Sequence, residues 1–223
     1  QVVYEEEASE LRMLGELGVD AVTLGNHEFD YKAEGLANML DTAVSSGDPI
    51  PSIVVCNVDW DAMEDAGLTE DQKLIEDAFK NYGIEEYIVV EKGDVKIAIT
   101  GVFGKDSLDC VPNCPLVFEN PVEAVKDTVE EIQEEENVDM IVCASHSGTN
   151  SDPKKSEDEI LAKAVPDIDL IISGHSHTVL EKPIVYGNTT IVSCGEYGSR
   201  LGSLDMQQLD NGRWTVGDYE LIP

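Results

Sequence analysis

Three apolar segments of this sequence end in short polar loops that contain histidine, and this arrangement restricts the possible folds more than any other feature. The segments cover residues 20–24, 138–144 and 168–173. Each has the length of a buried strand, and glycine or serine follows it directly. Helical patterns lie between the segments. The sequence therefore predicts a mixed α/β fold with the polar loops at the carboxyl ends of strands.

All four histidines of the chain fall in these loops. The loops read Gly25-Asn26-His27-Glu28-Phe29-Asp30, Ser145-His146-Ser147-Gly148 and Gly174-His175-Ser176-His177. Histidine is the commonest nitrogen ligand for transition metals. Together with asparagine and aspartate at strand ends, it provides the groups that a hydrolytic metal centre needs. The pattern indicates a metal site.

Other elements follow from hydrophobic periodicity. Residues 84–90 and 95–102 are predicted to form a β-hairpin, because Gly93-Asp94 suits the tight turn between them. Residues 59–82 are acidic and partly helical, and residues 184–221 have the Gly-rich pattern of short antiparallel strands. The remaining predictions are helices over residues 4–17, 32–46, 121–136 and 156–165, and a strand over residues 52–58.

The charge balance of the 223-residue chain restricts its partners. It has 46 acidic and 14 basic side chains, which give a formal net charge of -32. Such a surface repels nucleic-acid polymers and anionic lipid. A small phosphorylated substrate is compatible with it, because bound divalent cations can supply local positive charge. No stretch reaches the roughly 18 to 20 apolar residues of a membrane span.

The five cysteines contain no Cys-x-x-Cys pair. Cys56, Cys143 and Cys194 lie in apolar runs and are predicted to be small buried hydrophobic residues. Cys110 and Cys114 flank a three-residue loop, and two states are open for them. They form a small disulfide in an oxidising compartment or stay free thiols in a reducing one.

Taken in order, the segments GNHEFDY, SHSG and GHSH closely resemble the calcineurin-like metallophosphoesterases, in particular their 5′-nucleotidase and UDP-sugar hydrolase branch. The likeness continues through residues 17–22 and 195–202. It implies a four-layer α-β-β-α sandwich of the metallophosphoesterase type. It also implies hydrolysis of nucleotide phosphate esters at a centre with two divalent metal ions, for which Zn and Mn are both suitable.

The same resemblance assigns roles to the metal ligands. Asn26, His146 and His175 would bind one metal ion, and His177 would bind the other. The His-x-His spacing agrees with this division, because alternate side chains of an extended or looping backbone can reach two neighbouring points.

The resemblance makes His27 a catalytic residue that stabilises charge on the phosphate or protonates the leaving oxygen. Asp30 would orient the imidazole ring of His27. Simpler interpretations are that Asn26 occupies a turn, that Asp30 caps the following helix, and that His27 makes a structural hydrogen bond. Glu28 is expected to serve the structure of the loop.

The family's first two motifs, Asp-x-His and Gly-Asp, are not found ahead of the first predicted helix, so three of seven expected metal ligands are missing. Residues 1–223 are therefore expected to be a partial, N-terminally incomplete catalytic domain. An upstream segment of the same protein, or another copy, would complete the fold, and a C-terminal substrate domain would follow. By resemblance, the expected location is extracellular, periplasmic or at the cell surface.

Two alternative functions are open from the sequence. One is a 2′,3′-cyclic-nucleotide phosphodiesterase, which requires the same metal-assisted attack on a diester. The other is a non-catalytic fragment that retains a single weak metal site.

Overall fold

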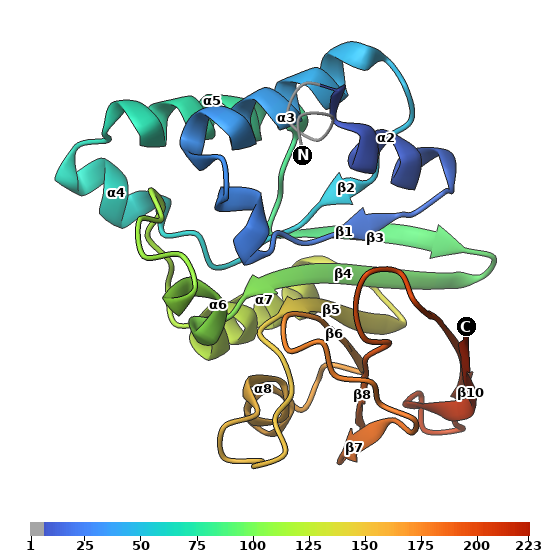
Figure 1. Cartoon of the computed structure of the whole chain (residues 1–223). Coiled ribbons are helices and arrows are strands. Elements are labelled where there is room, and N and C mark those ends of the chain that lie inside the picture. Colours follow the sequence, from blue (N-terminus) through green and yellow to red (C-terminus); the bar gives the residue numbers. More distant parts are fainter. Residues whose placement is uncertain (1–6) are drawn as a thin grey trace.

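A computed structural model describes residues 7–223, and its largest element is a six-stranded sheet in the order β3-β4-β5-β6-β8-β7 (Figure 1). The four central strands β4, β5, β6 and β8 run parallel, and the edge strands β3 and β7 are antiparallel to their neighbours. The strands are β3 (Tyr87–Lys92), β4 (Val95–Phe103), β5 (Met140–His146), β6 (Leu170–Ser173), β7 (Ile184–Tyr186) and β8 (Thr189–Val192).

Helices cover one face of this sheet. α7 (Pro121–Glu135) and α8 (Glu157–Ala164) pack on it through a buried cluster that includes Val125, Ile132 and Leu161. The start of α7 is well determined by the sequence, because Pro121 occupies its first turn and Asn120 caps it by accepting backbone N–H groups.

A β-hairpin covers the opposite face of the sheet. It consists of β9 (Leu201–Gln208) and β10 (Trp214–Ile222), which pair antiparallel. Met206 and Trp214 pack against Met140 and Val142 of β5. The Trp214 indole N–H also donates a hydrogen bond of 2.6 Å to the Asp139 carbonyl oxygen. Helices therefore cover one face of the sheet, and the hairpin covers part of the other.

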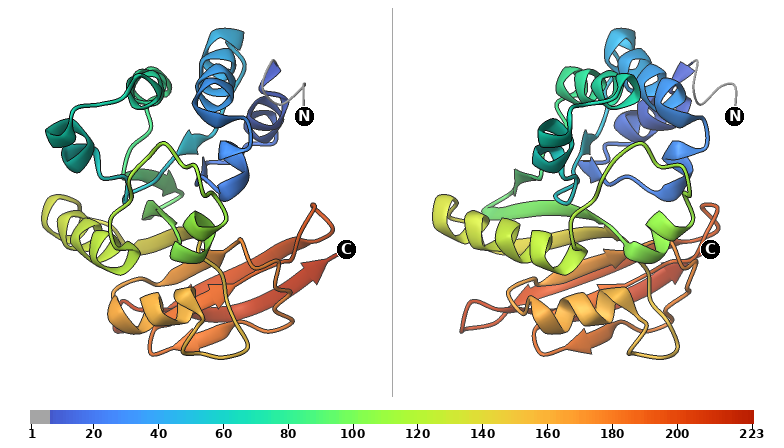
Figure 2. Two further views of the ribbon diagram at one scale, coloured as in Figure 1. Left: turned by 60° about the vertical axis from the view of Figure 1, so that its left-hand side comes forward. Right: turned by 90° about the vertical axis from the view of Figure 1, so that its left-hand side faces the viewer.

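The N-terminal part forms a second helical layer beyond β4 (Figure 2). Its hydrophobic cluster contains Leu36 and Leu40 of one helix, Ile75 of another, and Ile53 of a short strand. A parallel pair, β1 (Ala21–Val22) and β2 (Ser52–Ile53), lies beneath the helices. The helices are α2 (Ser9–Glu16), α3 (Lys32–Ser46), α4 (Trp60–Ala66) and α5 (Glu70–Tyr82), and a 3₁₀ helix, η1, covers Asn26–Phe29.

The mixed α/β fold predicted from the sequence is confirmed, as are the β3–β4 hairpin and helix α3. Helix α2 lies within the helix predicted over residues 4–17 but is shorter, and residues 4–6 lie outside the described residues. None of the described helices is long and apolar enough to cross a membrane. Cys110 and Cys114 are free thiols.

Two sequence predictions need correction. The strands predicted over residues 20–24 and 52–58 shorten to β1 and β2, because the chain beyond Ile53 leaves β1 and makes single bridges to Glu85 and Phe118. The tail is not purely antiparallel either. Strand β8 joins the main sheet parallel to β6, since its Thr190 and Val192 face Leu170 and Ile172 in register.

The parallel strands bring their carboxyl ends to one edge of the sheet. Phe103, the last residue of β4, is the register partner of His146, the last residue of β5. Ser145 is in turn the partner of Ser173 at the end of β6. The three loops that follow these strands therefore meet at this edge, where ligand sites of α/β sheets usually lie.

Candidate metal and catalytic site

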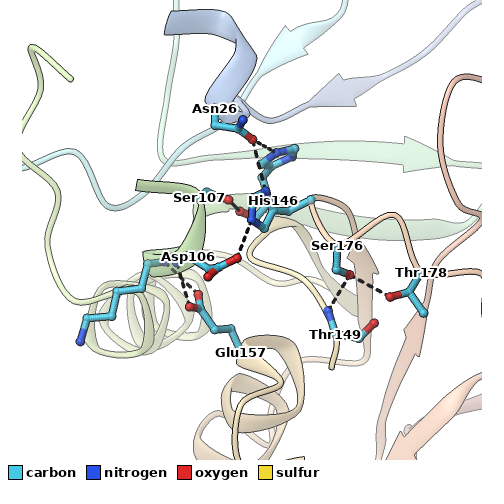
Figure 3. Close-up of polar contacts among 10 residues, drawn as sticks. Asn26, Asp106, Ser107, His146, Thr149, Glu157, Ser176 and Thr178 are labelled. Atoms are coloured by element: carbon cyan, nitrogen blue, oxygen red, sulfur yellow. Dashed lines mark hydrogen bonds and ion pairs between the residues drawn. The ribbon is translucent and has the colours of Figure 1, made fainter. Parts of the chain in front are cut away.

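Asn26, His146 and His175 converge at the carboxyl edge of the sheet. The Asn26 Oδ1 atom lies 2.9 Å from His146 Nε2 and 3.2 Å from His175 Nδ1. Figure 3 shows Asn26 above His146, on η1 at the end of the loop from β1. The three side chains come from loops far apart in the chain, so the fold alone brings them together.

This set of donor atoms suits a divalent cation. Ligand atoms around one ion lie roughly 3 Å from each other, because each is about 2 Å from the ion. An amide oxygen and two imidazole nitrogens form a mixed N/O set that does not select strongly between Zn and Mn. Burial lowers the pKa of His146 to about 4, and the neighbouring His175, His27 and His177 contribute to the shift. His146 therefore stays neutral at pH 7 and keeps a lone pair for a metal ion.

Close packing fixes the His146 ring and its backbone. A Cβ atom on Gly25 would lie 2.7 Å from His146 Cε1, so only glycine leaves room for the ring. Phe103 stacks nearly parallel to the ring, with 6.4 Å between centroids. The Ser107 hydroxyl donates to the His146 carbonyl oxygen at 2.5 Å. The residue is thus held through both its ring and its backbone.

The loop after β6 has an unusual backbone. His175 and His177 have φ values of 64° and 54°, in the left-handed region that non-glycine residues rarely adopt. Ser176 lies between them and accepts a 3.0 Å hydrogen bond from the Thr149 N–H, as Figure 3 shows. Strain of this kind collects at functional sites and persists where the surroundings enforce it.

His177 lies outside the convergent set. Its Nδ1 atom is 2.7 Å from the Glu196 carboxylate, and its ring is tilted against Tyr197. His177 thus has other partners than Asn26, although it lies close enough to His146 to contribute to the lowered pKa of that residue.

His27 and Asp30 form a pair of their own. His27 Nδ1 lies 2.9 Å from Asp30 Oδ2, and 73% of the His27 side chain is exposed. Helix α3 starts without a side-chain cap. The Asp30 carboxylate therefore contacts His27 and does not cap the helix. Glu28 accepts a 2.6 Å hydrogen bond from the Gly25 N–H and so serves the loop.

Asp106 is a site residue that sequence reasoning missed. It lies on the short helix α6 (Lys105–Asp109), and its Oδ2 atom is 2.9 Å from His175 Nε2. One signal could have identified it, since Asp106 follows the parallel strand β4 as His146 and His175 follow β5 and β6. The sequence analysis used β4 only as the second strand of a hairpin.

Within residues 7–223, no three His, Cys, Asp or Glu side chains are arranged to hold a metal ion. The convergent set therefore depends on the amide of Asn26 in addition to its two histidines. With the geometry of the site established, comparison with known proteins becomes informative.

Residues 3–179 match the model of the calcineurin-like phosphoesterase family. The chain belongs to the calcineurin-like phosphoesterase family. Members of this family use divalent metal ions in phosphoester hydrolysis. The resemblance to this family noted from the sequence is thus confirmed.

Two curated relatives support this assignment of the phosphoesterase. The chain is 32% identical over 213 residues to the trifunctional nucleotide phosphoesterase protein YfkN of Bacillus subtilis, covering 89% of this chain and 14% of that protein. It is 34% identical over 164 residues to an apyrase of Tabanus yao, covering 74% of this chain and 25% of that protein. The phosphoesterase thus spans a quarter or less of the length of these relatives.

A solved structure has the same fold as the phosphoesterase. The 5′-nucleotidase precursor from Thermus thermophilus superimposes with a TM-score of 0.75 at 24% sequence identity. The match covers 99% of this chain and 41% of that protein.

Proposed function

We propose that this phosphoesterase hydrolyses phosphate esters of nucleotides at a centre of two divalent cations. The observation that carries the proposal is the convergence of His146 Nε2 and His175 Nδ1 on Asn26 Oδ1, at 2.9 and 3.2 Å. The names of the relatives, a nucleotide phosphoesterase and an apyrase, support nucleotides as the substrate class.

In this proposal Asn26, His146 and His175 hold one cation, and His177 holds the second. A bound cation supplies polarisation of the phosphate oxygens and local positive charge in a protein of net charge -32. The side chains of the protein determine where the cations and the phosphate lie. His146 is rigidly packed against Phe103, which favours one fixed location for the reacting phosphate.

His27 is the proposed general acid. Its Nδ1–H donates to the Asp30 carboxylate, and this contact leaves Nε2 on the exposed side of the ring. A carboxylate partner fixes the orientation of the imidazole ring. His27 then donates its Nε2 proton to the leaving oxygen, while Asp30 holds the other ring proton.

Residues 1–223 are proposed to be part of the catalytic domain, and the remaining metal ligands to come from an upstream segment of the same protein or from another copy. The described residues offer one amide oxygen and three imidazole nitrogens for two ions. A cavity of about 500 Å³ lies between the β9–β10 hairpin and the sheet. In this proposal the additional segment would pack into that cavity. Ile172 lines this cavity and is 50% exposed although it lies on the central strand β6.

Metal content and hydrolysis test this proposal together. The purified chain is incubated with Mn²⁺ or Zn²⁺, freed of excess ions, and analysed by elemental mass spectrometry. Phosphate release from AMP, ADP and 2′,3′-cyclic AMP is then measured. We expect Asn26→Ala to lower bound metal at least about tenfold, whereas the exposed control Asn137→Ala leaves it unchanged.

Equal metal content in Asn26→Ala and Asn137→Ala would contradict the assigned ligand set. His27→Ala separates catalysis from metal binding. We expect it to reduce phosphate release by about 10²- to 10⁴-fold, the usual contribution of general acid catalysis, with metal content unchanged. Unaltered turnover would remove His27 from the proposed role.

A further inference from the structure

Helix α6 contacts both histidine loops and also helix α8, and none of the functions assigned so far uses it. Ser107 donates to the His146 carbonyl oxygen, and Asp106 Oδ2 lies 2.9 Å from His175 Nε2. Glu157 of α8 accepts hydrogen bonds from the backbone N–H groups of Lys105, at 2.8 Å, and Asp106, at 3.0 Å. Figure 3 shows Glu157 below Asp106, on the side away from Asn26.

The packing around α6 leaves little freedom. A Cβ atom on Gly104 would lie 2.4 Å from Ser147 Cα and 2.8 Å from Glu157 Oε2. The first turn of α6 is therefore pressed against the His146 loop and against α8. The Asp106 backbone is fixed by these contacts, although its side chain is 73% exposed.

Two acceptors face the two nitrogens of the His175 ring. Asn26 Oδ1 lies 3.2 Å from Nδ1, and Asp106 Oδ2 lies 2.9 Å from Nε2. A neutral imidazole has one ring proton, so the two acceptors compete for it. Hydrogen bonds to a carboxylate are roughly twice as strong as bonds to a neutral amide oxygen, so the proton is expected on Nε2. The Nδ1 lone pair then points toward Asn26 and His146.

We propose that Asp106 is a positioning residue that holds the ring proton of His175 on Nε2 and so frees Nδ1 as a metal ligand. Glu157 acts one step further out, because its carboxylate fixes the backbone from which Asp106 extends. The inference rests on the proposed function for the identity of the ligand. The tautomer of His175 is a property of the metal-free protein and does not depend on it.

The position of the ring proton can be measured directly. The intact 223-residue chain is labelled with ¹⁵N-histidine, stripped of metal, and examined by long-range ¹H–¹⁵N NMR at pH 8. The His175 signals are assigned by their loss in His175→Gln. The wild type is expected to show a protonated Nε2, and Asp106→Ala is expected to move the proton to Nδ1, where Asn26 accepts it. Asp109→Ala is the matched control, because Asp109 is an exposed carboxylate on the same helix.

Zinc affinity of the same proteins, measured by calorimetry, gives the second readout. Loss of a group that hydrogen-bonds to a metal ligand typically lowers metal affinity about 10- to 100-fold. We expect that loss for Asp106→Ala, a smaller one for Asp106→Asn, which keeps an acceptor oxygen without the charge, and none for Asp109→Ala. Circular dichroism of each variant shows whether it is folded.

An unchanged His175 tautomer in folded Asp106→Ala would overturn the inference, and so would equal zinc affinity in Asp106→Ala and Asp109→Ala. Absence of zinc binding by the wild type would instead refute the proposed metal site. In that case the tautomer measurement alone still decides whether Asp106 controls the ring of His175.

Discussion

The buried carboxylate of Asp158 predicts how the free energy of unfolding depends on pH. Its side chain is fully buried on α8, where Oδ1 accepts a 2.5 Å hydrogen bond from the Ser145 hydroxyl and Oδ2 has no hydrogen-bond partner among the described residues. Burial raises the pKa of Asp158 to about 6, and the nearby Ser145 and Ser173 hydroxyls and the Gly148 backbone only partly offset the effect. The ionised carboxylate is thus poorly satisfied in the folded protein.

The size and direction of the effect follow from this pKa. A folded pKa of about 6 against an unfolded value of 3.8 means that protonated Asp158 favours folding, and that this stability is lost as pH rises through 6. The shift of about two units corresponds to roughly 3 kcal/mol at pH 8. At pH 5 the loss is roughly 1.5 kcal/mol by the same linkage relation.

Asp158→Asn keeps the shape and an acceptor for Ser145 but carries no charge. We expect its free energy of unfolding to exceed that of the wild type by up to about 3 kcal/mol at pH 8 and by about half as much at pH 5. At pH 8 this corresponds to a rise in Tm of roughly 6 to 12 °C for a chain of this size. Urea unfolding at the two pH values measures the difference.

Asp65→Asn is the control for the large overall charge, since Asp65 is an exposed carboxylate on α4. It is expected to change the free energy of unfolding by less than about 0.5 kcal/mol at either pH. If the difference between Asp158→Asn and the wild type is the same at pH 5 and pH 8, the argument from a buried, unsatisfied carboxylate is refuted.

Other parts of the structure make further predictions. Gly25→Ala should displace the His146 ring, since the new Cβ would lie 2.7 Å from it, and should lower manganese binding in a titration; unchanged binding would mean that the ring has free space. Burial raises the pKa of the Cys56 thiol to about 12. Iodoacetamide at pH 8 should therefore modify the exposed Cys110 long before Cys56, and equal rates by mass spectrometry would contradict the burial. Leu36→Ala should cost about 2 to 5 kcal/mol in urea unfolding, because Leu36 is fully buried on α3; a loss below about 1 kcal/mol would show that this core is loosely packed.

Elements with strong local signals could be predicted from the sequence. Helix α3 matches its predicted range because apolar residues recur at helical spacing until Gly47, whose φ of 72° ends the helix. The β3–β4 hairpin was equally clear, since its turn residue Gly93 also has a positive φ. The loops with Asn26, His146 and His175 could be found because each follows an apolar segment of strand length.

Features that depend on long-range pairing could not be predicted. Helix α6 has five residues, too few for a periodic pattern, and is held by contacts to α8 that lie about 50 positions away. The contact between His177 and Glu196 could not be predicted either, because only the folded loop brings the two side chains within 2.7 Å. The lengths of β1 and β2 were overestimated, because propensity cannot show where a strand loses its neighbour.

The wide spacing of the convergent residues along the chain has a consequence for folding. Asn26 and His175 lie 149 positions apart, yet they face each other across 3.2 Å. Closing a loop of that size costs a flexible chain about 5 kcal/mol in conformational entropy. In the native state folding has already brought the two loops together, so a cation that binds there does not bear this cost. An unfolded chain is therefore a poor chelator, and a cation that binds this set binds the native state selectively. At a concentration about one hundred times its Kd, such a cation would stabilise the native state by about 2.7 kcal/mol. In the proposed metal site, metal supply and the stability of the fold would thus be coupled through the contact between two distant loops.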